Sequence, residues 1–412
     1  MGVKAVLTLH VRPGEASGQA RLACPTPVPD KYQSSLLFIK KRADHGMRIA
    51  LVVPGGVDRS GEYRVIPALL SLIQRLALDN DVQVVALNHG DQAGEWDLLG
   101  ARVHNIGSRR TRLMAVRTLW ALHRSAPFDI VHAIWSGSCG LIAVIAGKLL
   151  RIPSLIHVAG GELVSMPEIG FGGMQTWKGR LREPAVLRSA SCVTAASAPV
   201  IGALSELGLS AQRVPLGVDL KVWPPREPVR RDRSKPARLI HIASLNRVKD
   251  QSTLLMALVS LKELGFSFEV DIVGEDTLGG AIQALAESAG LSKVARFRGF
   301  LTQRQLRPLL EAADLLIHSS RYETGPLVVL EAAAAGVPTV GTAVGHIAEW
   351  APHAAVSVPV GDWRSLSAAI GSVIEDDDLR LRIAREALRR TTQEDADYTA
   401  ARFHALYASL MK

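Results

Sequence analysis

The chain alternates short apolar segments with helical patterns, and this alternation restricts its possible folds more than any other feature. In the first half, apolar runs at 48–53, 82–87, 129–133, 153–158 and 192–195 are separated by longer segments. One of these segments, 65–76, has its apolar residues at helical spacing. Strands that alternate with helices form parallel sheets covered by helices on both faces. The first half therefore predicts a doubly wound α/β domain.

The same alternation restarts after a break that is rich in proline and arginine, at 223–237. Apolar runs follow at 239–243, 268–273, 294–297, 315–318 and 339–340, and 412 residues are too many for one ordinary core. We expect two Rossmann-like domains that face a cleft, at 47–222 and 238–385, with 223–237 as the linker. A helical segment at 386–412 ends the chain. The segment 1–46 is basic and contains Pro, Gly and Ser, and we expect it to be a disordered, dispensable leader or the result of an upstream start.

The composition is that of a globular protein, with 48% hydrophobic and 21% charged residues. Cys24, Cys139 and Cys192 lack metal-site spacing, which argues against a zinc site and a disulfide framework. This fits a reducing compartment, so we expect a cytoplasmic protein. No run of eighteen apolar residues is present, which argues against a spanning helix.

Two carboxylates, Glu323 and Glu331, flank a Gly-Pro break before an alanine-rich helical pattern. Pro326 suits the first helical position, and the amides of Gly325 and Leu327 are then free to bind an anion. The two carboxylates could accept hydrogen bonds from hydroxyl groups, and the nearby amides could bind a diphosphate. Together these groups would suit a nucleotide sugar. The alternative is that Glu323 only caps the helix and Glu331 faces solvent.

The segment 319–340, which contains both carboxylates, resembles the donor-binding motif of retaining glycosyltransferases of family 4, which have the GT-B fold. The likeness continues to Gly345 and Glu349. It implies that Glu323 contacts the donor sugar and Glu331 the ribose. It also implies that the turn at Thr324, Gly325, Pro326 and Leu327 approaches the phosphates. In this family the last helix crosses back onto the first domain, and 386–412 would do so here.

A second part of the resemblance is the segment 243–250, after the first strand of the second half. Lys249 matches a family lysine that neutralises the donor diphosphate, and we assign Lys249 and Glu323 as the catalytic residues. Ser244 stands where the family has an arginine. Arg247, three residues later, either reaches the phosphates or faces solvent.

Gly55 and Gly56 end the first strand and resemble the family's glycine loop beside the donor phosphates, with a simple tight turn as the alternative. A P-loop is rejected because Glu62 and Tyr63 stand where Lys and Ser/Thr are required.

On the acceptor side, many relatives have a histidine at the position that Ala159 occupies here. His157, on the same side of the strand, is either its displaced equivalent or a packed core residue. Glu162, in the following loop, is a second acceptor-side candidate.

Five arginines, at positions 109, 110, 112, 117 and 124, lie in one window without an acid and alternate with apolar residues. This pattern indicates either a helix at a membrane surface, with weak peripheral contact, or an ordinary surface helix. Nucleic-acid binding is not expected, because aromatic side chains are not interleaved with the cations.

The resemblance thus implies a retaining glycosyltransferase that uses a nucleoside diphosphate sugar and a lipid-linked or saccharide acceptor, plausibly in cell-surface polysaccharide or glycolipid assembly. By resemblance, the acceptor attacks on the face that the leaving diphosphate vacates, and that phosphate takes the proton. No cofactor and no metal are expected. A sugar-nucleotide epimerase and a non-catalytic nucleotide-sugar-binding subunit stay open as alternatives.

Overall fold

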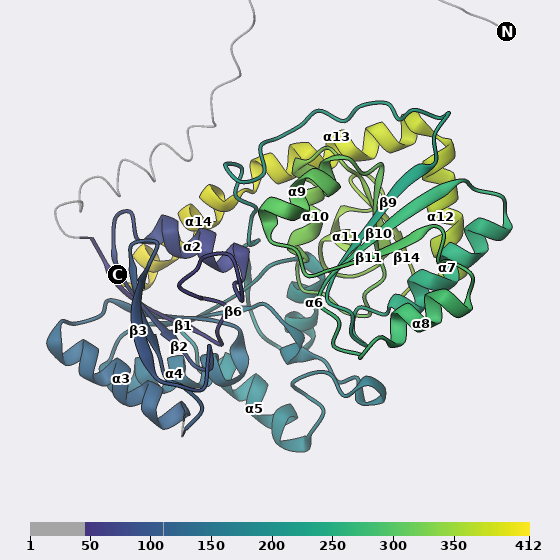
Figure 1. The fold of residues 1–412 in the computed structure, drawn as a ribbon. Coiled ribbons are helices and arrows are strands. Elements are labelled where there is room, and N and C mark those ends of the chain that lie inside the picture. Colours follow the sequence, from purple (N-terminus) through teal and green to yellow (C-terminus); the bar gives the residue numbers. More distant parts are fainter. Residues whose placement is uncertain (1–45, 110) are drawn as a thin grey trace, which may run out of the picture. The chain divides into compact units, whose positions relative to one another are not determined.

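Two mainly parallel sheets organise the computed structural model, which describes residues 46–109 and 111–412 (Figure 1). The first sheet has the order β3-β4-β2-β1-β5-β6-β7-β8. Only β3 runs antiparallel, against β4. The strands are β1 Arg48–Val53, β2 Asp81–Ala86, β3 Gly94–Leu98, β4 Ala101–Asn105, β5 Ile130–Ile134, β6 Ser154–Val158, β7 Cys192–Ala195 and β8 Gln212–Arg213.

The second sheet is parallel throughout and has the order β11-β10-β9-β12-β13-β14. Its central strand β9 pairs with β10 on one side and β12 on the other, so the strand order reverses between β9 and β12. Ligands of such sheets bind at the carboxyl ends of the strands where the order reverses. The strands are β9 Ala237–Ile242, β10 Phe268–Val273, β11 Ala295–Gly299, β12 Leu315–His318, β13 Thr339–Thr342 and β14 Val356–Val358.

Helices cover both faces of the first sheet, as its buried central strands require. One face packs against α2 (Pro67–Leu76) and α14 (Ala396–Leu410). The other packs against α3 (Thr111–Ser125), α4 (Leu141–Leu150), α5 (Trp177–Arg188) and α6 (Ala198–Glu206).

The second sheet is covered in the same way. The helices on one face are α7 (Gln251–Glu263), α8 (Ala281–Ser288) and α12 (Trp363–Glu375). Those on the other are α9 (Gln303–Glu311), α10 (Leu327–Ala334) and α11 (Gly345–Trp350), and α13 (Asp377–Gln393) contributes to both cores.

The last two helices differ from the sequence interpretation in their boundary. Residue 386 lies inside α13, and the helix that packs on the first sheet begins at Ala396, where Asp395 accepts a hydrogen bond from the Tyr398 amide at 2.8 Å. Helical periodicity on both sides hid this break. The hydroxyl of Tyr407 in α14 then lies 2.6 Å from Nδ1 of His132 in β5, in the core under the first sheet.

Of the predicted leader 1–46, all but Gly46 lies outside the described residues. Within the described part of the chain, no helix is long and apolar enough to cross a bilayer.

Candidate functional site

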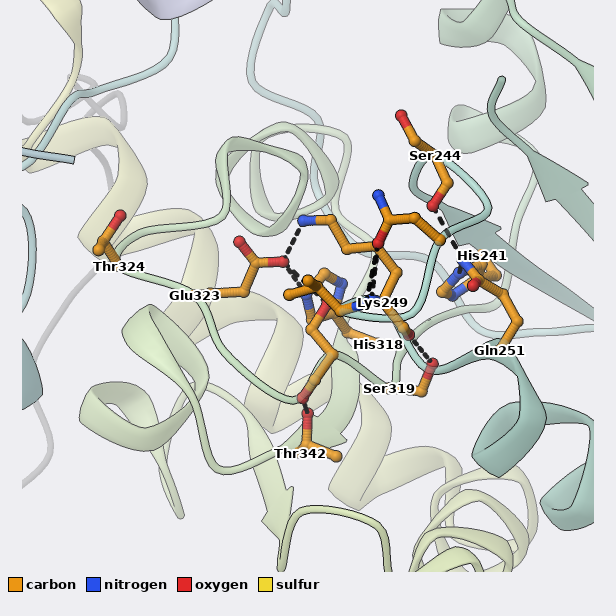
Figure 2. Close-up of polar contacts among 12 residues, drawn as sticks. His241, Ser244, Lys249, Gln251, His318, Ser319, Glu323, Thr324 and Thr342 are labelled. Carbon is orange, nitrogen blue, oxygen red and sulfur yellow. Dashed lines mark hydrogen bonds and ion pairs between the residues drawn. The ribbon is translucent and has the colours of Figure 1, made fainter. Parts of the chain in front are cut away.

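Glu323 lies in the loop after β12, and three donors converge on one of its oxygens (Figure 2). Lys249 forms an ion pair with Oε1, while His318 Nε2 lies 3.1 Å and the Ser320 hydroxyl 2.8 Å from the same atom. Burial alone would raise the pKa of Glu323, but Lys249 and His318 lower it to about 2. The carboxylate is therefore charged at neutral pH, and its second oxygen points away from these donors.

Lys249 is held by a loop that follows β9. The Asn246 side chain accepts hydrogen bonds from the amides of Val248 and Lys249 at 3.0 and 3.1 Å, which closes a turn. The Ser319 hydroxyl donates to the Lys249 carbonyl at 2.8 Å, joining this loop to the end of β12. The backbone around the lysine is thus fixed from two strand ends, and its ammonium group faces Glu323.

The start of α10 lies directly after Glu323. Pro326 is the residue before the first helical position, one place earlier than the sequence predicted, and no side chain caps the helix. Helix ends are commonly misplaced by one residue. The Val329 amide bonds to the Pro326 carbonyl, whereas the amides of Gly325, Leu327 and Val328 meet no acceptor within the described ranges. Glu323 is therefore not a helix cap, and three backbone donors are free.

Gly325 is required at this turn by its neighbours. A Cβ atom at this position would lie 2.8 Å from the Cβ of Ala196 and 2.9 Å from Nε2 of His346. Both distances are below ordinary carbon contact, so a larger residue would push the turn out of place.

Glu331 is buried inside α10, with 5% of its surface exposed, so the solvated alternative is wrong. Its Oε1 accepts a hydrogen bond from Nε2 of Gln303 at 2.9 Å. Burial raises the pKa of Glu331 to about 7, against the opposing effect of Gln303. No cation pairs with this carboxylate among the described residues, so it gains from a ligand that donates hydrogen bonds.

Ser244 and Arg247 are both exposed on the loop after β9. The Ser244 carbonyl accepts a hydrogen bond from Gln251 at 3.1 Å, and its hydroxyl points away from the cluster around Glu323 (Figure 2). Arg247 has no hydrogen bond or ion pair with the described residues. The structure does not bring either side chain to Glu323, and their contact with the donor stays a prediction.

Gly55 and Gly56 form a tight turn after β1. Gly56 has a φ of +75°, and a Cβ there would lie 2.5 Å from Cγ1 of Ile66. The loop that follows reaches the second half of the chain, where the rings of Tyr63 and Phe300 lie 6.2 Å apart. The turn needs its glycine for local reasons, so a donor contact stays a prediction.

His157 is a packed core residue rather than a displaced acceptor-side group. It is fully buried in β6, where Nδ1 lies 3.0 Å from the Thr194 hydroxyl and Phe403 of α14 packs on the ring. Burial lowers its pKa to about 3. The sequence could not exclude an acceptor-side position, because the packing partner comes from the other end of the chain.

Glu162 follows β6 and is buried as well. Its two oxygens accept hydrogen bonds from the amides of Ser136 at 2.9 Å and Gly160 at 2.7 Å. Burial raises the pKa of Glu162, although the hydrogen bonds from these amides act to lower it. The carboxylate thus ties the ends of β5 and β6 together, and its contact with an acceptor stays a prediction.

Sequence reasoning missed several residues of the site. His318 and Ser320 bond to Glu323, Gln303 bonds to Glu331, and the buried His346 lies against Gly325. The position of His318 at a strand end, five residues before Glu323, was an available signal. Gln303 and His346 gave none, since they reach the site only through tertiary packing.

The loop after β12 also contacts the first sheet's domain. The Thr324 hydroxyl donates to the Ala159 carbonyl at 2.9 Å, and the Ser197 hydroxyl donates to the Thr324 carbonyl. Ala159 follows β6 and Ser197 precedes α6, so these bonds position the candidate donor site against the first half. No group of three possible metal ligands occurs in the part of the chain that the structure describes.

Comparison with known proteins matches both halves. Residues 64–218 match the model described as "Glycosyl transferase 4-like domain", and residues 226–390 match "Glycosyl transferases group 1". The chain belongs to the group 1 glycosyltransferases. Its domains are those of the GT-B fold that the resemblance implied.

Relatives of this chain include the glycogen synthase of Mycobacterium tuberculosis, 33% identical over 180 residues, which are 43% of each chain. The match thus spans less than half of that relative. The putative glycosyltransferase EpsF of Bacillus subtilis is 29% identical over 313 residues, covering 70% of this chain and 78% of EpsF.

Solved structures share the fold. HepE of Anabaena, in complex with UDP and glucose, superposes with a TM-score of 0.68 and 20% identity over 88% of this chain and 100% of HepE. Sucrose-phosphate synthase of Thermosynechococcus elongatus superposes with a TM-score of 0.73 and 20% identity, over 88% of this chain and 99% of the synthase.

Proposed function

We propose that this protein transfers a sugar from a nucleoside diphosphate sugar to an acceptor hydroxyl with retention of anomeric configuration. The observation that carries the proposal is the meeting of Lys249, Glu323 and the uncapped start of α10 at the ends of β9 and β12. The cation and the free amides there suit the phosphates of such a ligand, and the charged carboxylate can accept hydrogen bonds from its sugar hydroxyls.

In the proposed complex, the diphosphate lies against the α10 amides and Lys249, whose ammonium group leaves its partner to meet the phosphate charge. Glu323 then accepts hydrogen bonds from sugar hydroxyls, and His318 and Ser320 hold its carboxylate in place. Glu331 accepts from the ribose, which replaces the solvation that this buried group lacks. The structure of HepE with UDP and glucose supports a nucleotide donor for this fold.

The proposed chemistry needs no group beyond donor and acceptor. The acceptor oxygen forms a bond to the anomeric carbon on the face from which the diphosphate leaves, while the bond from that carbon to the phosphate oxygen breaks. The acceptor proton passes to the departing phosphate. Lys249 and the α10 amides stabilise the charge that develops on the leaving group, an effect that oriented donors supply strongly in protected sites.

The acceptor is a hydroxyl of a saccharide or of a lipid-linked saccharide. Incubation with a panel of UDP-, GDP- and ADP-sugars and an acceptor extract tests the proposal, with the product's anomeric configuration read by NMR. Transfer with retention supports it. Inversion contradicts the mechanism, acceptor-free epimerisation indicates an epimerase, and binding without turnover indicates a non-catalytic subunit.

A further inference from the structure

The helices α3, α4 and α5 give one face of the first sheet's domain an unusual surface. Their buried residues share one core, and Arg112 of α3 donates to the Ser138 hydroxyl in the segment before α4, so the three helices form a continuous layer. Figure 1 shows α3 and α5 along the lower edge of this domain. The exposed side of this layer is called the basic helical face below.

The charge of the basic helical face has a single sign. The only acidic residue within the three helices is Glu183, which is buried and bonded to Ser136 and Arg182. The basic residues of these helices are Arg112, Arg117, Arg124, Lys148, Lys178, Arg180, Arg182 and Arg188. Much of the chain's net charge of +9 is therefore concentrated here.

Large apolar side chains project from the same face between the cations. Trp177 is 63% and Leu181 66% exposed, and they lie one turn apart on α5. On α3, exposed Leu113, Arg117, Trp120 and Arg124 follow one helical stripe. The remaining large apolar residues exposed on these helices are Met114 of α3 and Ile145 and Leu149 of α4.

The two tryptophans are paired with cations. The guanidinium carbon of Arg124 lies 4.9 Å from the Trp120 ring centroid, and Nζ of Lys178 lies 5.6 Å from that of Trp177. Tryptophan beside a basic side chain suits the boundary of a bilayer, where the ring enters the headgroup region and the cation meets lipid phosphates.

We propose that the basic helical face docks the protein on an anionic lipid bilayer. The basic side chains of this face complement the phosphates of such a membrane. Its exposed leucines, methionine and tryptophans are buried at the membrane surface. A second copy of the chain fits poorly, since a symmetric contact would oppose like charges. Nucleic acid would complement the charge but leaves the aliphatic side chains without a partner. This docking does not depend on the glycosyltransferase proposal.

Vesicle co-sedimentation of the full chain tests the docking. The protein should bind phosphatidylcholine vesicles that contain phosphatidylglycerol, should not bind pure phosphatidylcholine, and should be released by salt. The double variant Arg117→Glu/Arg124→Glu should bind roughly tenfold more weakly or worse, since each basic residue contributes appreciably to such binding. The matched control Lys293→Glu/Arg385→Glu reverses two exposed charges in the second half and should bind as the parent does.

A second variant, Trp177→Ser/Leu181→Ser, keeps the charges of α5 and tests the apolar part of the surface. It should bind more weakly and keep its salt dependence, and circular dichroism should show both surface variants folded. Absence of binding to anionic vesicles, equal binding to neutral vesicles, or equal loss in the control would overturn the proposal. So would tight binding to a nucleic-acid duplex with no binding to vesicles.

Discussion

Lys249 and Glu323 form an ion pair although 74 positions separate them in the chain. Each follows a central strand of the second sheet, β9 and β12, and the pairing of these strands brings the two loops together. Both charges are largely shielded from solvent, so the pair is a pre-formed charged site whose cation and anion suit different parts of one ligand.

Replacement of Lys249 by methionine should reduce transfer about 10²–10³-fold, because the leaving diphosphate loses its cation. The pKa of Glu323 should rise, since the ammonium group helps to hold it near 2. Steady-state kinetics with the best donor measure the first effect. Lys293→Met, at an exposed site of the second half, is the control. Unchanged turnover in Lys249→Met would rule the lysine out as a catalytic residue.

Glu331→Gln should stabilise the protein at pH 8. The folded pKa of Glu331 is raised to about 7, so the folded state binds more protons than the unfolded state between about pH 4.5 and 7. The free energy of unfolding therefore decreases as pH rises from about 4.5 to 7, because Glu331 must then become charged in its buried position. Glutamine avoids the buried charge, and urea unfolding should show a gain of about 1–3 kcal/mol at pH 8 and little change at pH 4.5.

The exposed Glu287→Gln is the control for this gain and should change stability little at either pH. A loss of stability in Glu331→Gln at pH 8 would show that the carboxylate is better solvated than its burial indicates.

Acid should destabilise the protein through its buried histidines. Burial lowers the pKa values of His157, His241 and His346 to about 3, whereas each titrates near 6.5 when unfolded. The unfolded state then binds more protons between these values, so stability falls as pH drops from about 6.5 to 3. Urea midpoints across this range should fall, with a shallower slope in His346→Gln. An unchanged slope in that variant would contradict the neutral, buried state of His346.

Thr324→Val should uncouple the loop after β12 from the first half. It removes the hydroxyl that donates to the Ala159 carbonyl but keeps the side-chain shape. The free energy of unfolding should therefore fall by about 0.5–1.5 kcal/mol. Transfer should fall more than UDP binding does, because the bond aligns the donor site with the domain expected to hold the acceptor. Thr324→Ser keeps the hydroxyl and should restore transfer. Equal kinetics in Thr324→Val and the parent would show that this bond does not position the site.

The sequence predicted the two parallel α/β arrays because their buried strands are continuous apolar runs between helical patterns. It missed the antiparallel pair β3–β4, since Gly94–Leu98 is short and largely exposed and has only two apolar residues, Trp96 and Leu98. The sequence also predicted that Lys249 and Glu323 follow strands. Their ion pair could not be predicted, because it depends on which strands are neighbours in the sheet. The bond from Gln303 to Glu331 and the packing of His346 on Gly325 depend on tertiary contacts that no local pattern encodes.

Calorimetric titration of UDP, with GDP and ADP as alternatives, tests the central claim that this site holds a nucleoside diphosphate. The parent protein should bind one nucleotide and release about half a proton near pH 7, as ribose hydroxyls lower the pKa of Glu331 from about 7. Glu331→Gln should bind about tenfold more weakly without proton release, and Lys249→Met should also bind more weakly. If both variants bound the nucleotide as tightly as the parent, the donor site would have to lie elsewhere.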